Sequence, residues 1–547
     1  MPNLKVTVQA GDITTVKSDL VVVNLFKGVT TPGGATGALD KATGGLLRHF
    51  LKAGDFKGDF KDTALLYPEA APMKRILLVG LGEQEKWTLD RARQVAARVV
   101  KRASGMGITR YHTIVHGAGI GGLDPAEAAA AVTEGTLLGA YKFEHYKSKK
   151  PQKEGEKKPE LAEVVLLEAD KGKLPEMKEA VRVATIISES TLFTRTTATL
   201  SGDEGTPEEM ARIAQEMARE VGLKCTVMDK ARIQKEGMNA FLAVNRGSAR
   251  EPRFVVLEWP GKKGEDTLVF VGKGITFDSG GISLKPGEKM DEMKFDKCGA
   301  IAVFGILRAC ALLKVPQRVI GLTPFTENLP SGTAYKPGDI FTSLNGKTIE
   351  ILNTDAEGRV ILSDALYYAD RFKPAAVVDM ATLTGAVQIA LGNQCSGMMG
   401  NNAALLQAIK ESAERTHERV WELPFYPEYD ELIKAKTGDW ANTGGRMAGT
   451  ITAGRFLEKF IGDYAWAHLD IAATAWQDGA IKYNDEYSPG LATGVGVRLL
   501  TDLVRNWKGL PSSKKPEGAK GDAKSVKRTP GKRETGEVEE RAVRRTR

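Results

Sequence analysis

The sequence predicts an α/β fold that comprises two successive α/β domains and a C-terminal tail. A chain of 547 residues is too long for a single hydrophobic core. Strand-like apolar runs and helix-like patterns alternate in two successive parts of the chain, which is typical of α/β domains. Residues 508–547 contain almost no large apolar side chains. An apolar share of 42% and a charged share of 27% are those of an ordinary globular protein.

The first domain is predicted over residues 1–170. Short apolar runs alternate there with longer patterns of helical spacing. The predicted strands are Leu4–Val8, Asp19–Leu25, Arg75–Leu81 and Ala162–Leu167, and the predicted helices are Leu89–Ala103 and Pro125–Leu138. The polar, lysine-rich stretch Lys142–Glu160 is interpreted as a solvated loop near the end of this domain.

Residues 171–200 are predicted to connect the two domains through a helix that includes Glu176–Ser190. The second domain is predicted over residues 201–507, and the start of its first helix is marked in the sequence. Thr206 can cap this helix, Pro207 suits its first position, and Glu209 completes a capping box.

The rest of the second domain predicts a mixed, mainly parallel sheet. Strands are predicted at Thr267–Val271, Arg318–Leu322, Lys347–Leu352 and Ala375–Met380, and helices around Lys297–Leu313 and Val360–Arg371. Functional sites in such sheets gather at the carboxyl ends of the strands. Two clusters of charged residues follow predicted strand ends, so we expect these clusters to lie close together.

The positive charge of the chain lies in its tail. Residues 508–547 hold 13 Lys and Arg against 6 Asp and Glu, so they carry +7 of the net charge of +8 and leave +1 for residues 1–507. We predict that the tail is disordered, because it cannot bury enough apolar surface to offset its ordering entropy. Binding to DNA is therefore an alternative function that only the tail supports.

Several classes of protein are excluded by what the sequence lacks. No uninterrupted apolar run reaches the roughly 18 to 20 residues that span a bilayer, and the first residues lack the pattern of a secretion signal. We expect a cytoplasmic protein without a membrane partner. The four cysteines have no C-x-x-C spacing, so neither a zinc knuckle nor a disulfide scaffold is predicted.

The first charged cluster is NTDAEGR, residues 353–359, which directly follows an apolar run. Asp355, Glu357 and Arg359 stand at alternate positions and would share a face only while the backbone stays extended. Crowded carboxylates disfavour one another's ionised forms. We therefore expect a bound cation near them.

The second charged cluster lies in VGKGITFDSGGISLKPGEKMDEMKFDKCGA, residues 271–300. It supplies Lys273 at a strand end, Asp278 and Lys285 in a glycine-rich loop, and Asp296 near a helix start. A phosphate loop is the competing interpretation, but no G-K-[ST] follows the glycines and the acids would repel phosphate. The loop therefore favours cations.

The ligand types indicate which cations would fit. Carboxylates without histidine suit Mg²⁺ or Mn²⁺, and Zn²⁺ also accepts Asp and Glu. Four acids offer enough oxygens to bridge two ions, which lie about 3.5 to 4 Å apart in two-metal hydrolases. Close to two cations, one lysine could lose its proton and ligate metal, while a second stays charged and polarises a carbonyl. Each residue alone has an ordinary structural explanation, but seven such charges at adjacent strand ends would stabilise a fold poorly.

Together the motifs resemble the leucyl aminopeptidase family of hexameric two-metal exopeptidases. Besides the two clusters, the resemblance rests on ENLPSGTAYKPGD, DMATLTGA and GDWANTGGRMAGTITAGRFLEKF. It covers residues 1–507 and is strongest from Phe270 to Trp476. It implies a macro-like N-terminal α/β domain, a catalytic two-metal peptidase domain and a cytoplasmic homohexamer.

The resemblance also implies roles for individual residues. One metal ion would be held by Lys273, Asp278, Asp296 and Glu357, and the other by Asp278, Asp355 and Glu357. Lys285 would be the protonated electrophile, and Arg359 would hold a bicarbonate ion that serves as general base. Backbone amides of Ala356, Gly358 and Leu383 would help to bind that anion. Met293, Thr382 and Gly385 would line the pocket for the first side chain of the substrate.

The implied activity is that of a metal-dependent aminopeptidase, a hydrolase of the protease class. A hydroxide that bridges the two ions would release N-terminal amino acids from peptides with a free N-terminus, preferably leucine or other apolar residues. The implied ions are Mn²⁺ or Zn²⁺, with Mg²⁺ and Co²⁺ as alternatives. Some bacterial relatives also bind DNA as architectural or regulatory proteins, which is the competing function.

Overall fold

The first sheet holds six strands in the order β1-β6-β5-β2-β4-β3, and all neighbours are parallel except β3 with β4. Its strands are β1 (Lys5–Ala10), β2 (Val21–Phe26), β3 (Thr63–Leu66), β4 (Ile76–Gly82), β5 (Arg110–Ile114) and β6 (Glu163–Glu168). Its helices are α1 (Gly34–Ala42), α2 (Leu46–Ala53), α3 (Leu89–Ser104) and α4 (Pro125–Gly139). The predicted strands and helices of this part are present, whereas β3, β5, α1 and α2 were not predicted.

Alternation along the central strands explains how this sheet carries helices on both faces. Val22 packs with α3 and α4 in one core cluster. Val21 and Val23 pack with Leu39 of α1 and Leu47 of α2 in the other. Because successive side chains of a strand point to opposite faces, one run of valines serves both layers.

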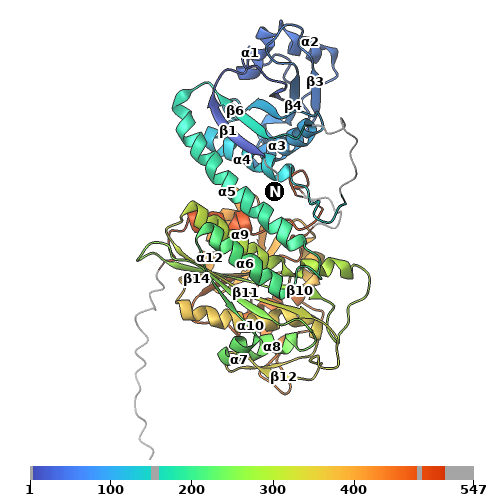
Figure 1. Cartoon of the computed structure of the whole chain (residues 1–547), viewed down its shortest axis with the longest axis vertical. Helices are drawn as coiled ribbons and strands as arrows, with labels where there is room; N and C mark the ends of the chain where they lie inside the picture. The colour runs from blue at the N-terminus through green and yellow to red at the C-terminus, as the bar shows by residue number, and fades with distance from the viewer. Residues whose placement is uncertain (1–3, 149–158, 477–482, 489, 512–547) are drawn as a thin grey trace, which may run out of the picture. The chain divides into compact units, whose positions relative to one another are not determined.

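The helix α5 (Leu174–Thr199) follows β6 and is longer than the predicted Glu176–Ser190. It packs against α4 and against α9 (Cys298–Leu313), a helix of the second sheet (Figure 1). The computed structural model describes residues 4–148, 159–476, 483–488 and 490–511, and residues 1–509 form one compact unit. Most of the predicted loop 142–160 and nearly all of the predicted disordered tail lie outside the described residues.

The second sheet is mixed and mainly parallel, as predicted, with the order β16-β15-β18-β14-β9-β11-β8-β7 and β10 paired to β11. Its strands are β7 (Lys224–Met228), β8 (Arg253–Trp259), β9 (Thr267–Gly272), β10 (Gly274–Asp278), β11 (Arg318–Asn328), β14 (Ala376–Ala381), β15 (Ser396–Gly400), β16 (Val420–Glu422) and β18 (Ala465–Asp470). Its helices are α6 (Pro207–Val221), α7 (Lys230–Glu236), α8 (Asn239–Asn245), α9, α10 (Glu357–Ala369), α11 (Gly385–Leu391), α12 (Ala403–Thr416), α13 (Gly449–Glu458) and α14 (Val497–Arg505).

The start of α6 follows the predicted signals in part. The Thr206 hydroxyl accepts a hydrogen bond from the Glu209 N–H at 3.3 Å, and Pro207 is the first helical residue. The Glu209 carboxylate bonds to Arg212 at 2.6 and 2.7 Å. The cap is therefore present, while Glu209 serves an ion pair on the helix surface.

One predicted strand lies in a different sheet. Residues 348–350 form β13 (Thr348–Glu350), which pairs with β12 (Ile340–Thr342) and β17 (Trp440–Ala441) in a separate three-stranded sheet. The prediction that NTDAEGR follows a strand of the main sheet is therefore wrong. A short apolar run indicates a strand but carries no information about its partners.

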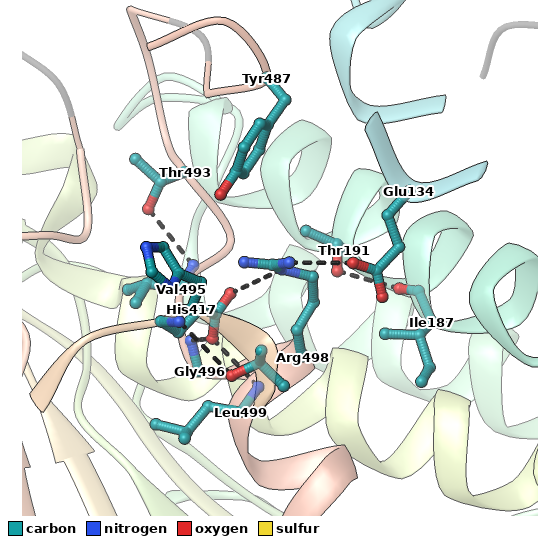
Figure 2. A network of polar contacts seen from close by, with 12 residues as sticks. Glu134, Ile187, Thr191, His417, Tyr487, Thr493, Val495, Gly496, Arg498 and Leu499 are labelled. Carbon is teal, nitrogen blue, oxygen red and sulfur yellow. Dashed lines mark hydrogen bonds and ion pairs between the residues drawn. The ribbon is translucent and has the colours of Figure 1, made fainter. Parts of the chain in front are cut away.

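A buried polar network joins the helices of the two sheets (Figure 2). Arg498 of α14 is 3% exposed and lies 3.1 Å from a carboxylate oxygen of Glu134 in α4. The same guanidinium lies 3.2 Å from Glu418, whose other oxygen accepts hydrogen bonds from the N–H groups of Gly496 and Leu499. Arg93 of α3 also pairs with Glu134.

None of the described helices combines the length and the apolar character that crossing a membrane requires.

Candidate active site

Four separate segments bring the predicted charged residues together. Lys273 directly follows β9, and Asp278 is the last residue of β10. Asp296 lies in a 3-10 helix, Met290–Lys297, just before α9. Glu357 is the first residue of α10 and follows a 3-10 turn, Thr354–Ala356, that contains Asp355. The chain at NTDAEGR is thus a turn that leads into a helix, so Asp355, Glu357 and Arg359 do not share the face of an extended strand.

Three carboxylates crowd one small volume. Oxygen atoms of Asp278, Asp355 and Glu357 all lie within 4.8 Å of one another. Asp278 is 2% exposed and Glu357 is 1% exposed. Burial of like charges at such distances is unfavourable unless cations lie among them.

Two lysine amines lie between these acids. Lys273 Nζ is 2.8 Å from an oxygen of Asp296 and 2.8 Å from an oxygen of Glu357, and it donates a hydrogen bond to the Thr382 carbonyl at 2.9 Å. Lys285 Nζ is 2.9 Å from Asp278 and also pairs with Asp355. Each lysine therefore contacts two acids of the predicted metal site.

The charges and the burial of the cluster shift the pKa values of both its lysines and its acids. Burial by itself would lower the pKa of Lys273, but the carboxylates of Asp296 and Glu357 outweigh it and raise that pKa. The pKa of Lys285 rises for the same reason, through Asp278 and Glu357. Burial and the charge of Glu357 raise the pKa of Asp355 to about 7. Two ammonium groups thus leave the acids incompletely neutralised.

Several buried oxygens of the cluster accept no hydrogen bond. Both carboxylate oxygens of Glu357 are in this state among the described residues, as are Oδ2 of Asp296 and Oδ1 of Asp355. Ion-pair contacts with lysine reach some of these atoms without the geometry of a hydrogen bond. Buried acceptors without partners are rare in proteins. The donor set of carboxylate oxygens and a lysine amine therefore fits divalent cations.

Neighbouring side chains hold the acids in place. Asn328, at the end of β11, donates a hydrogen bond to Asp278 Oδ1 at 2.8 Å, and the Gly280 N–H donates another at 2.9 Å. Thr382 donates a hydrogen bond to Asp296 Oδ1 at 2.7 Å. Sequence reasoning missed Asn328, although its place at the end of a long apolar run, on the same edge of the sheet, was a usable signal.

A glycine is required next to Lys273. A Cβ atom on Gly358 would lie 2.5 Å from Lys273 Cε and 2.7 Å from its Nζ. The first turn of α10 can therefore approach the lysine only because residue 358 has no side chain.

Arg359 lies beside the acids with part of its guanidinium unpaired. Its Nη1 donates a hydrogen bond to the Asn442 carbonyl at 2.9 Å, while its Nε has no partner among the described residues. Burial lowers the pKa of Arg359 to about 10, against the opposing effect of Glu357. The group remains a cation at neutral pH and can receive an anion.

The other predicted residues lie around this cluster without a contact that tests their roles. The Leu383 N–H donates to Asp470 at 3.2 Å, and the Ala356 N–H donates to the Asn353 carbonyl at 3.3 Å. Met293 belongs to the 3-10 helix of Asp296, and Gly385 begins α11. Their parts in anion and substrate binding stay predictions.

Comparisons with known proteins cover both parts of the chain. Residues 192–501 match the family model described as "Cytosol aminopeptidase family, catalytic domain", and residues 22–150 match that of the family's N-terminal domain. A probable cytosol aminopeptidase of Roseiflexus castenholzii is 42% identical over 507 residues, covering 92% of this chain and 99% of the relative. One from Geotalea uraniireducens is 45% identical over 473 residues, covering 86% of this chain and 93% of the relative.

Two solved structures share the fold over almost the whole chain. The bottromycin maturation enzyme BotP in complex with Mn has a TM-score of 0.78 at 32% identity, with 89% of this chain and 99% of that one covered. A mutant of tomato leucine aminopeptidase has a TM-score of 0.80 at 28% identity, with 92% of this chain and 97% of that one covered.

Proposed function

The chain belongs to the cytosol aminopeptidase family and is a metal-dependent aminopeptidase, and we propose that the cluster around Glu357 is its two-metal active site. The observation that carries this proposal is the group of buried carboxylate oxygens that accept no hydrogen bond. Six acidic or basic side chains from five segments converge there, and all of them match the residues that the sequence motifs single out.

The proposed ligands divide between two ions. Lys273, Asp278, Asp296 and Glu357 would hold one, and Asp278, Asp355 and Glu357 would hold the other. The contact of Lys273 with both Asp296 and Glu357 supports the first set, and the closeness of the three carboxylates supports the second. Lys273 would have to lose its proton to ligate metal. When bound, such ions lower the pKa of water and polarise the scissile carbonyl.

The charged groups of the chain itself would handle the substrate. Lys285 would stay protonated and donate to the oxygen that becomes negative when the carbonyl is attacked. Its present partners, Asp278 and Asp355, would be neutralised by the cations, which frees the ammonium group. Arg359 would hold bicarbonate as general base, since its Nε has no hydrogen-bond partner in the described part of the chain. Met293, Thr382 and Gly385 would line the side-chain pocket, with a preference for leucine and other apolar residues.

The remaining parts of the proposal concern ions, assembly and domains. Mn²⁺ or Zn²⁺ suits the ligands, with Mg²⁺ and Co²⁺ as alternatives, and a related structure contains Mn. We propose a cytoplasmic homohexamer that acts on peptides with a free N-terminus. Residues 1–170, 171–200 and 201–507 would be the N-terminal domain, the connecting segment and the catalytic domain. Contact of the basic tail with DNA stays a separate hypothesis.

Hydrolysis of a panel of aminoacyl amides tests the activity. Metal-free protein is restored with Mn²⁺, Zn²⁺, Co²⁺ or Mg²⁺ before the assay. We expect turnover with at least one ion and the highest rate for leucine or another apolar residue. Absence of turnover across the whole panel would refute the proposed function.

A further inference from the structure

The main-chain carbonyl that accepts the hydrogen bond of Arg359 belongs to Asn442, a fully buried residue of the motif GDWANTGG. Asn442 directly follows β17, which pairs in parallel with β13. Five hydrogen bonds are described for Asn442, and their partners are Glu350, Leu352, Asn353 and Arg359. None of these partners is a proposed metal ligand, yet they lie on both sides of Asp355 and Glu357 in the chain.

The hydrogen bonds of Asn442 depart from the pattern of a parallel ladder at one atom. The strands β13 and β17 pair Glu350 with Ala441, so one further step pairs Ile351 with Asn442. The Asn442 N–H donates to the Glu350 carbonyl at 3.0 Å, as this ladder requires. The ladder would next join the Leu352 N–H to the main-chain carbonyl of Asn442. This N–H donates instead to the side-chain atom Oδ1 of Asn442 at 2.8 Å.

This exchange of acceptors leaves the main-chain carbonyl of Asn442 available to Arg359. The amide oxygen replaces that carbonyl in the ladder, and the carbonyl accepts a hydrogen bond from Arg359 Nη1 at 2.9 Å. Both residues are buried, so the donors around them need acceptors within the protein. If residue 442 had no acceptor in its side chain, the Leu352 N–H and the guanidinium would depend on the same carbonyl.

The amide group of Asn442 also fixes the start of the turn that carries the acids. Its Nδ2 donates to the Asn353 carbonyl at 2.6 Å, and the Asn353 N–H donates to its Oδ1 at 3.3 Å. The side chain of Asn353 in turn accepts a hydrogen bond from the Asp355 N–H at 2.8 Å. Asn442 therefore holds the residues just before Asp355 and the guanidinium that follows Glu357.

We propose that Asn442 is a positioning residue of the peptidase reaction, which sets the guanidinium of Arg359 relative to the acids of the turn. This inference rests on the proposed role of Arg359 in holding an anion. A guanidinium presents its donors in a rigid plane, so its direction decides where an anion can lie. Displacement of such a group by about 1 Å can lower a rate by about 10²-fold.

Steady-state kinetics of Asn442→Ala, Arg359→Ala and the double variant test the proposal. Asn442→Ala should lower kcat by about 10- to 100-fold and leave KM nearly unchanged, because Arg359 acts on the anion and not on the substrate. The double variant should be no slower than Arg359→Ala, since residues that act as a unit have effects that do not add. Metal analysis should find both ions in Asn442→Ala.

The outcomes of this cycle distinguish the inference from the proposed function. Losses that multiply in the double variant would refute the inference, because Asn442 would then act independently of Arg359. If Arg359→Ala is slow and Asn442→Ala keeps the parent rate, the inference about Asn442 alone fails. If Arg359→Ala itself keeps the parent rate, the proposed role of Arg359 fails and the inference fails with it.

A second variant, Asn442→Asp, separates positioning from stability. Its carboxylate can still accept the hydrogen bond of the Leu352 N–H, so the main-chain carbonyl stays with Arg359, whereas the hydrogen bond to the Asn353 carbonyl is lost. We therefore expect a higher kcat than that of Asn442→Ala, although the buried charge should lower the melting temperature. A folded Asn442→Asp that is as slow as Arg359→Ala would overturn the proposal.

The matched control is Asn401→Ala, at the residue that follows β15. The Asn401 amide also joins two main-chain groups, since it accepts from the Trp466 N–H at 2.7 Å and donates to the Tyr464 carbonyl at 3.1 Å. Asn401→Ala should keep the kcat of the parent. If kcat follows the melting temperature across the variants of Asn401 and Asn442, Asn442 acts through stability alone and the proposal is refuted.

Discussion

The chain buries two clusters of opposite charges, and they differ in how completely the charges are paired. Around Arg498, the carboxylates of Glu134 and Glu418 form ion pairs with arginine, and Glu418 also accepts two main-chain hydrogen bonds. Around Glu357, four acids share two lysines, and several oxygens accept no hydrogen bond. Most members of both clusters are buried, whereas Lys285 and Asp355 of the second cluster are partly exposed.

The pKa values show what this difference means. Burial would raise the pKa of Glu134, but Arg93 and Arg498 outweigh it and lower that pKa below its usual range. The pKa of Asp355 moves the other way, to about 7, because burial and neighbouring acids prevail. The first cluster is complete within the protein and serves stability. The second lacks positive charge, which divalent ions would supply, in agreement with its proposed role in metal binding and catalysis.

The largest expected effect is a loss of turnover when an acid of the Glu357 cluster is replaced. Glu357→Gln should lower turnover by more than about a thousandfold, because it removes a ligand shared by both ions. This loss exceeds the loss of rate that removal of one oxyanion donor causes. Metal analysis should show lost ions, and added Mn²⁺ should no longer raise the melting temperature. Asp278→Ala should behave in the same way. Full occupancy of both ions in either variant would contradict the assignment of bridging ligands.

The next effect is on stability and concerns the other cluster. Glu134→Gln leaves Arg93 and Arg498 buried with less counter-charge and should cost about 3 to 5 kcal/mol of unfolding free energy. Folded Glu134→Gln should keep its metal ions. Denaturant unfolding of metal-free protein measures the change. Glu179→Gln is the control, because its ion pair with Arg182 is exposed and such pairs contribute at most about 1 kcal/mol.

The stability comparison can fail in an informative way. Metal-free Glu357→Gln should lose much less stability than Glu134→Gln, since it removes a charge that other acids repel. If both variants lose equal stability, the two clusters are equally well paired and the contrast drawn above is wrong.

The two lysines of the second cluster should respond differently. Lys285→Ala should keep both ions and lose about 10²- to 10³-fold in rate, as expected for a donor to the oxyanion. Lys273→Ala should lose metal first, because a ligand is removed. Metal content and rate, measured on the same samples, distinguish the roles. Equal metal loss in both variants would contradict the assignment of different roles to the two lysines.

The sequence predicted most acids of the proposed active site because they stand in two short, dense motifs. VGKGITFDSGG and NTDAEGR place most of the cluster within residues 273–359, and glycines and strand ends indicate a site there. The same reasoning placed the strand before residues 353–359 in the main sheet, whereas this strand, β13, belongs to a separate sheet. Local patterns indicate a strand or a turn, whereas the partner of a strand depends on contacts distant in sequence.

The Glu134–Arg498 pair could not be predicted in this way. Its members are 364 positions apart, and each alone resembles an ordinary surface charge on a helix. A cavity at the carboxyl edge of the first sheet was not predicted for a related reason. Its lining comes from four strand ends, and no single loop among them carries a recognisable motif.

The smallest effect concerns a third buried group, His116, which has neither a counter-charge nor a proposed ligand. Its Nδ1 lies 3.0 Å from the Asn24 amide nitrogen, which donates to it, so the ring is neutral. Burial lowers the pKa of His116 from 6.5 to about 4. Below pH 6.5 the unfolded chain binds a proton that the folded chain refuses, so stability falls with pH down to about 4 and is unaffected above 6.5.

Replacing His116 should therefore make the unfolding free energy less dependent on pH below 6.5. Between pH 7.5 and 5.5, His116→Asn should lose about 1.4 kcal/mol less unfolding free energy than the parent, the value of one pKa unit. Denaturant unfolding at the two pH values gives the difference, whatever the substitution costs at neutral pH. His49→Asn is the control, because His49 is exposed. If His116→Asn and the parent lose equal unfolding free energy between these pH values, the pKa of the buried His116 ring is not lowered. The folded chain would then protonate the ring with the help of a group that is not yet identified.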